Sequence, residues 1–203
     1  MPRAGKQKQE PNQKLVEMKK VFMLVMVAFM TLAMSQKAQA IEDPNPKGTF
    51  VLGARAGFYP GWGSNVVGDY TLINNWWKGH FTVGGYVGFN TRAWHHDYVG
   101  STYVERWTNF AVMPRATYGL NITKDFEVHA GLMMGVAYHR WTYHWDNEVY
   151  NNVYEPGEDW NFIQAEVVGC RYYFTPNFGV EAEVNYFWPG YQTYFNVGLS
   201  FKF

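Results

Sequence analysis

Three adjacent residues, His95, His96 and Asp97, form the densest group of possible metal ligands in the sequence. Neighbouring side chains of an extended strand point to opposite faces, so these three groups cannot converge on one ion. The spacing also lacks the helical i, i+4 geometry of common zinc sites. With a single cysteine, Cys170, the chain has no intramolecular disulfide and no cysteine-based zinc site. We therefore expect no metal ion and no cofactor.

Nucleophilic catalysis is the second chemistry to weigh, and it needs a serine hydroxyl beside a histidine. Beyond residue 40 the sequence contains only Ser64, Ser101 and Ser200, and no histidine stands two positions before any of them. Folding of the surrounding loops could still bring Ser101 to His95 or His96. The pattern favours a protein that is not an enzyme.

A further set of polar residues shares a spacing rather than a neighbourhood. Each member lies in a segment where apolar residues recur at every second position, and its side chain points to the opposite face. The set is Arg55, Arg115, Glu127, His129, Glu166, Glu181 and Glu183. We expect these groups to pair inside a closed sheet, because a buried charge without a partner is costly. On this hypothesis Arg115→Ala destabilises the protein and opens an ion path.

The apolar residues opposite these charges fall into eight extended segments, and the last segment is the clearest. Its faces are Thr193, Phe195, Val197, Leu199, Phe201 and Phe203 on one side, and Tyr194, Asn196, Gly198, Ser200 and Lys202 on the other. The same rule places Glu166 of the sixth segment on the polar face. It places the apolar residues of that segment on the other: Ile163, Ala165 and Val167. Pro114 interrupts the fourth segment, where we expect a β-bulge.

One apolar face and one charged face on most segments suit a sheet that closes in lipid with its polar face inside. An even strand number places both chain ends on the same side. Aromatic residues gather where the strands would meet the two membrane surfaces: Trp76, Trp77, Phe126, Phe174, Phe178 and Phe203 at one, and Tyr59, Trp62, Trp94, Trp141, Trp160, Trp188 and Tyr191 at the other. The predicted fold class is all-β, an eight-stranded antiparallel transmembrane β-barrel.

In this pattern, from Phe50 to Phe203, the chain resembles the small, porin-like, eight-stranded outer-membrane β-barrels of Gram-negative envelopes. The resemblance implies location in the bacterial outer membrane and contact with outer-membrane lipid. It also implies insertion by the barrel assembly machinery, which reads a terminal strand ending in residues such as Phe201 and Phe203. We expect a monomer. A soluble lipocalin-type barrel is the structural alternative, but it would turn its charged face outward.

The N-terminus has the pattern of an export signal. Lys19 and Lys20 precede an apolar run of 14 residues, which is too short to span a hydrocarbon core of ~30 Å. Ala38 and Ala40 form an A-x-A site, so we expect cleavage before Ile41. The predicted division is 1–17, an upstream extension foreign to the native protein; 18–40, the signal peptide; 41–48, a periplasmic leader; and 49–203, the barrel.

The charge balance excludes one class of partner. The 17 basic and 17 acidic residues cancel over the chain, but the first 40 positions hold seven of the basic and two of the acidic ones, so the remainder carries a net charge of −5. Because such a segment has little to neutralise phosphates with, we expect no nucleic acid partner.

Two outer connections look like hairpins that continue above the membrane. One has Tyr98 and Tyr103 around a Gly-Ser turn at 100–101, and the other has Tyr150 and Tyr154 around an Asn-Asn turn. A crossing strand needs ~9–11 residues, so these longer strands would expose edges that recruit an extracellular protein. The predicted function is structural or surface interaction, meaning adhesion or protein capture. The alternatives are a small passive channel and, with less support, a lipid A modifying enzyme.

Overall fold

The structure of the protein is a computed structural model. It describes residues 45–59, 61–77, 79–98, 101–145, 156–188 and 194–203. The chain divides into two units, Met1–Gln39 and Ala40–Phe203, and the barrel belongs to the second. The predicted extension, the signal peptide and its cleavage site at Ala38, Ala40 and Ile41 lie outside the described residues and stay predictions.

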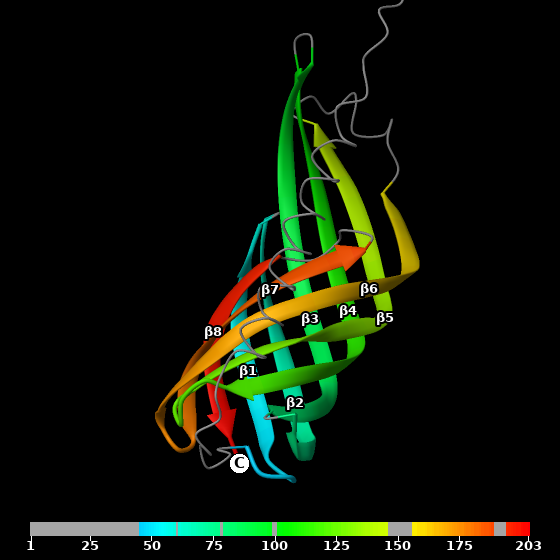
Figure 1. Cartoon of the computed structure of the whole chain (residues 1–203). Coiled ribbons are helices and arrows are strands. Elements are labelled where there is room, and N and C mark those ends of the chain that lie inside the picture. Colours follow the sequence, from blue (N-terminus) through cyan, green and yellow to red (C-terminus); the bar gives the residue numbers. More distant parts are fainter. Residues whose placement is uncertain (1–44, 60, 78, 99–100, 146–155, 189–193) are drawn as a thin grey trace, which may run out of the picture. The chain divides into compact units, whose positions relative to one another are not determined.

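The described residues form eight strands in one closed sheet (Figure 1). The strands are β1 (Phe50–Phe58), β2 (Trp62–Trp76), β3 (Gly79–Tyr98), β4 (Ser101–Asn121), β5 (Phe126–Trp145), β6 (Gly157–Thr175), β7 (Phe178–Trp188) and β8 (Phe195–Lys202). Neighbouring strands are antiparallel, and β1 pairs with β8 to close the ring. The predicted fold class is confirmed. Nowhere in the described ranges is there a helix long and apolar enough to cross a membrane.

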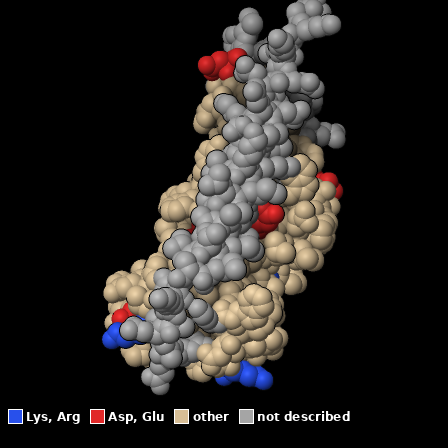
Figure 2. Space-filling view, viewed as in Figure 1, with Lys and Arg blue, Asp and Glu red and all other residues tan. Residues whose placement is uncertain are grey.

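Side chains alternate between the inside and the outside of the barrel, as a pleated strand requires. On β1, Val51 and Arg55 are buried inside while Phe50 and Phe58 are exposed outside. The other strands also turn large apolar side chains outward, and in the face seen in Figure 2 most of the visible surface of the described residues is uncharged. The outer face is therefore an apolar belt around a ring that leaves no sheet edge at that level.

On β6 the structure contradicts the predicted orientation. Ile163, Ala165 and Val167 are buried inside, with at most 3% of their surface exposed, and Glu166 is exposed outside. Glu166 pairs in register with Leu132, which is 57% exposed on the outer face of β5. The prediction that Glu166 belongs to the inner network is thus wrong. Because the interior is itself apolar at this level, hydrophobicity alone could not assign the two faces of this strand.

Pro114 does not introduce the expected bulge. The β4–β5 ladder keeps its register from Val112↔Val136 to Arg115↔Met133, and only the pairs at 113 and 114 are absent from it. The missing N–H of proline therefore removes a bond without adding a residue to the strand. Register shifts occur instead near the ends of two ladders, between Thr71 and Trp76 of β2 and between Tyr173 and Thr175 of β6.

The strands differ greatly in length, and the difference lies at one end of the barrel. β3, β4, β5 and β6 have 20, 21, 20 and 19 residues, whereas β1 and β8 have nine and eight. The β3–β4 hairpin extends beyond the closed ring in Figure 1. We call this the hairpin end, and the end that holds Phe50 and Lys202 the terminal end.

Candidate functional site

The interior near the terminal end is filled with ionisable side chains, which we call the charged layer. Its members are Arg55, Asp69, His80, Arg115, Glu127, His129, Arg171, Glu181 and Glu183, all at most 4% exposed. Four carboxylates thus face three guanidinium groups, and the remaining negative charge lies beside two imidazoles. His129 Nε2 is 3.1 Å from Glu183 Oε2, and His80 Nε2 is 3.6 Å from Glu127 Oε1. The layer pairs its charges across the bore.

Arg171 is the centre of the charged layer. Its Nε donates to Glu181 Oε2 at 2.9 Å, its Nη1 to Glu127 Oε1 at 3.3 Å, and its Nη2 to Asp69. The sequence prediction missed both Arg171 and Asp69. Register could have found Arg171, because it pairs directly with Glu127 on β5 and with Glu181 on β7, and paired residues share a face.

The two predicted arginines complete the layer. Arg115 contacts Asp69 Oδ1 at 2.9 Å through Nε and Glu183 Oε2 at 3.0 Å through Nη2. Arg55 pairs with Glu183 and donates from Nε to Asn65 Oδ1 at 2.6 Å. Of the predicted network, Arg55, Arg115, Glu127, His129, Glu181 and Glu183 therefore lie together inside, and Glu166 does not.

Glycines give this layer its room. A Cβ on Gly119 would lie 2.4 Å from His80 Nε2, and one on Gly169 would lie 2.6 Å from His129 Nε2. Real side chains cannot approach so closely, so the two imidazoles occupy the space that the glycines leave. An eight-stranded barrel has a bore just wide enough for its side chains, and here they fill it.

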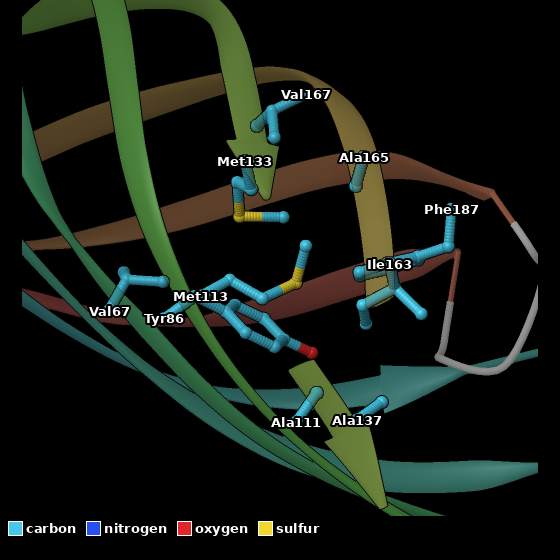
Figure 3. Packing of buried hydrophobic residues seen from close by; sticks show 10 residues of the cluster. All are labelled: Val67, Tyr86, Ala111, Met113, Met133, Ala137, Ile163, Ala165, Val167 and Phe187. Atoms are coloured by element: carbon cyan, nitrogen blue, oxygen red, sulfur yellow. The ribbon is translucent and has the colours of Figure 1, made fainter. Parts of the chain in front are cut away.

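Toward the hairpin end the interior becomes apolar (Figure 3). This apolar layer consists of Val67, Tyr86, Ala111, Met113, Met133, Ala137, Ile163, Ala165, Val167 and Phe187, each at most 3% exposed. In Figure 3, Tyr86, Met113 and Ile163 from three strands point toward one another. On β2, β4, β5, β6 and β7 alike, the apolar residues lie on the hairpin side of the charged ones. The two layers are therefore stacked.

A third, smaller layer follows above the apolar one. Asn109 Nδ2 donates to Asn90 Oδ1 at 2.6 Å, and Asn109 Oδ1 lies 2.8 Å from His139 Nδ1. At the opposite end the leader enters the barrel: Asn45 is 1% exposed and its Nδ2 donates to Glu127 Oε2 at 2.6 Å. Residues just before β1 therefore contribute to the filling of the bore.

The β3–β4 hairpin carries stacked aromatic side chains beyond the ring. Tyr103 lies between His96 and Trp145, with ring centroids 4.8 and 4.5 Å away, and Trp107 lies 5.7 Å from Trp141. Trp94 and Trp141 alternate in phase with the inward Asn90 and His139, so they belong to the inner face of the hairpins. The prediction that they belong to the outer aromatic belt is wrong.

The candidate metal-binding and catalytic residues of the sequence lie dispersed in this hairpin. His95 pairs in register with Val104, while His96 Nε2 lies 3.6 Å from Glu105 Oε2. Ser101 is the first residue of β4 and pairs with Tyr98, so it does not belong to the predicted Gly-Ser turn, whose other residue lies outside the described ranges. Among the described residues, no three His, Cys, Asp or Glu side chains gather as a metal site. Tyr150 and Tyr154 lie outside the described ranges.

The C-terminal strand closes the ring with its last residues. Phe203 N donates to Phe50 O at 2.8 Å, and Phe50 N donates to Phe203 O at 3.0 Å. Phe203 is 71% exposed, and the Phe201 ring lies 5.4 Å from that of Phe178. The proposed assembly signal thus lies at the seam, on the outer face of the barrel.

A closed antiparallel barrel with an apolar exterior and a charged interior defines a class. An unpaired sheet edge is not tolerated in lipid, which favours a closed sheet. A soluble barrel would have its apolar face inside and its charged face outside. The protein is therefore an outer-membrane β-barrel of the small, eight-stranded kind. The start of β1 and the end of β8 lie at the same end of the barrel. The predicted orientation, with this terminal end toward the periplasm and the long hairpins outward, stays a prediction.

No known protein family and no curated protein matches the chain. Among solved structures it is similar to the attachment invasion locus protein Ail of Yersinia pestis in complex with the heparin analogue sucrose octasulfate. The identity is 12%, the TM-score 0.48, and the match covers 76% of this chain and 97% of Ail. It is also similar to the N-terminal β-barrel domain of Pseudomonas aeruginosa OprF, with 17% identity, a TM-score of 0.48, and 77% and 98% of the two chains covered. Similarity at this level does not carry a function across.

Proposed function

We propose that this barrel is a non-enzymatic binding protein of the cell surface, which captures an extracellular polypeptide by strand addition to the outer part of β3. The observation that carries the proposal is an unequal pairing of β3. On one side the β2–β3 ladder ends at Trp62↔Thr91, and on the other the β3–β4 ladder continues to Tyr98↔Ser101.

Residues 93–97 of β3 consequently form a sheet edge. Among the described residues none pairs with them on the β2 side. An unpaired strand edge offers a row of N–H and C=O groups to an extended peptide, and such additions give affinity through main-chain hydrogen bonds. The edge lies beyond the closed ring, where no described strand pairs with it.

The side chains along this edge are suited to contact a partner. Trp94 is 43% exposed and has the Arg92 guanidinium 4.2 Å from its ring centroid. His95 and Asp97 are exposed on the opposite face. A peptide added to the edge would place alternate side chains against an aromatic face and a polar face, which is how strand addition acquires specificity.

The filled bore opposes the alternative of a small passive channel. Both the charged layer and the apolar layer consist of side chains with little or no exposed surface. Ions would have to displace paired charges in one layer and dewetted side chains in the other. The second predicted hairpin, at Val149 to Tyr154, lies outside the described residues and adds no support.

The experiment compares cells that display the intact barrel with cells that display a shortened hairpin. Deleting residues 95–104 and joining Trp94 to Glu105 through Asn-Gly keeps a natural pair of the ladder next to a favoured two-residue turn. Adherence is measured on wells coated singly with extracellular-matrix and serum proteins. We expect at least a tenfold loss of adherence at equal surface display.

Proline substitution separates the strand edge from the aromatic side chains. Adjacent residues direct their N–H groups to opposite sides of a strand, so only one of His95→Pro and His96→Pro removes a donor from the free edge. That variant should lose adherence, while His95→Ala and His96→Ala retain it. Equal adherence of the shortened and intact barrels, or adherence no higher than that of cells without the barrel, would refute the proposal.

A further inference from the structure

The outward face of β6 differs from that of the other strands. Within the apolar belt the other strands expose side chains such as Ala54, Val66, Val87, Val112, Met134, Val184 and Val197. At the same belt β6 exposes Gln164 and Glu166. On β6 itself these two residues are followed by Val168 and preceded by Phe162, which is 65% exposed. An amide and a carboxylate therefore lie within the lipid-facing surface.

Neither polar side chain finds a partner within the described barrel. No hydrogen bond or ion pair joins Gln164 or Glu166 to another described residue. Their cross-strand neighbours on β5, Met134 and Leu132, are apolar and more than half exposed, and those on β7 are the aromatic Trp188 and Tyr186. Polar groups inside a membrane are expensive and mark contacts with other polar groups, so this face calls for a partner at the same depth.

We propose that the outward face of β6 joins two copies of this protein side by side in the membrane. The Gln164 amide of one copy donates to the carboxylate of Glu166 of the partner subunit, and the twofold axis repeats the bond in reverse. The two residues lie two positions apart on one face, ~7 Å along the strand, which two long side chains can bridge. The contact is therefore self-complementary, as an isologous interface requires.

The hydrogen-bonding groups favour a second copy over another occupant. The face presents a donor and an acceptor of its own, so an identical face satisfies both, whereas a lipid tail satisfies neither. The sequence analysis predicted a monomer, and this proposal departs from that untested prediction. The proposal concerns the membrane-embedded wall, so it stands or falls independently of the β3 edge.

The lone cysteine supplies a native reporter for this contact. Cys170 is a free, partly exposed thiol that shares the outward phase of Glu166 on β6. The test uses outer membranes from cells that produce the full chain, treated with a mild oxidant or a short bismaleimide and run on non-reducing gels. We expect the Cys170 protein to form crosslinked dimers.

The control moves the single thiol to the opposite wall of the barrel. Val66, 47% exposed on β2, lies four strands away from β6 in a ring of eight. Cys170→Ser combined with Val66→Cys should crosslink at least fivefold less at equal protein levels. Equal crosslinking from the two walls, or none from Cys170, would overturn the proposal.

Substitutions at Glu166 distinguish the bond from mere proximity. Glu166→Gln keeps an acceptor and should preserve the dimer, whereas Glu166→Leu removes it and should weaken association by about tenfold. Sedimentation equilibrium in density-matched micelles measures the dimer fraction. Because leucine suits a lipid-facing position, the Glu166→Leu barrel should fold, and heat-dependent migration on gels verifies this. An unchanged dimer fraction in folded Glu166→Leu protein would contradict the assigned hydrogen bonds.

Discussion

The charged layer and the apolar layer fill the same bore by different physics, and the contrast explains which parts of the sequence could be interpreted. In the charged layer each residue is fixed by named partners, as Arg171 is by Asp69, Glu127 and Glu181. In the apolar layer any side chain of similar volume would satisfy its neighbours. On most strands, charges opposite apolar residues therefore identify the inner face, but where the inner face is itself apolar, as on β6, the rule fails and Glu166 lies outside.

The largest effect is expected where one group serves three others. Arg171→Met leaves Asp69, Glu127 and Glu181 with fewer partners, and an uncompensated buried charge typically costs ~3–5 kcal/mol. We expect the urea midpoint of the barrel in lipid vesicles, followed by tryptophan fluorescence, to fall accordingly or the barrel to fail to fold. Arg140→Ala on the exposed face of β5 serves as the control and should change stability little. Equal midpoints for the two variants would show that the charged layer does not hold the fold.

The apolar layer should respond through volume instead of charge. Ile163→Ala opens a cavity among fully buried neighbours, which typically costs ~2–4 kcal/mol. Its neighbour Phe162 points to lipid, and Phe162→Ala should cost less than Ile163→Ala because lipid chains fill the space and no cavity remains. The same urea titration compares the stability of the two variants. The reverse ranking would restore the orientation of β6 that the sequence alone suggested.

A smaller effect is expected from the leader. Asn45→Ala removes the 2.6 Å hydrogen bond to Glu127, and a bond to a charged group is worth ~1.5–3 kcal/mol when both partners are buried. Asn45→Asp, which replaces the donor with a second acceptor, should be worse than alanine. Unfolding of the protein with the leader intact provides the reference. If both variants unfolded at the same urea concentration as this reference, the leader would not contribute to the stability of the barrel.

The smallest expected effect is in conductance. Arg115→Ala alone should show no ion conductance in a planar bilayer, because the apolar layer still closes the bore above it. This revises the expectation that loss of Arg115 opens an ion path. Combining Arg115→Ala with Met113→Ala and Met133→Ala should produce discrete steps of ionic current. Steps in the single variant would show that the charged layer seals the barrel unaided.

The sequence was sufficient for the fold because most strands reveal their orientation through alternation. β1 and β7, for example, place Arg55, Glu181 and Glu183 opposite continuous apolar faces. β6 could not be assigned this way, because its inward Ile163, Ala165 and Val167 resemble lipid-facing residues. Its register with β5 and β7, which aligns Arg171 with two glutamates, was the missing constraint. The aromatic residues of the hairpins were misplaced for a related reason, since Trp94 and Trp141 can lie on either face of a strand above the membrane.

The seam between β1 and β8 imposes an order on assembly. Each of the other ladders joins strands consecutive in sequence, but the seam joins Phe50 to Phe203 at opposite ends of the described chain. Closing so long a loop carries the largest entropic penalty, so hairpins form first and the ring closes last. Until then Arg55 on β1 is separated from its partner Glu183 on β7, because β8 lies between them. An open barrel therefore carries unpaired charge at its edges, and such an intermediate cannot rest in lipid: it must be sheltered until the last strand is in place.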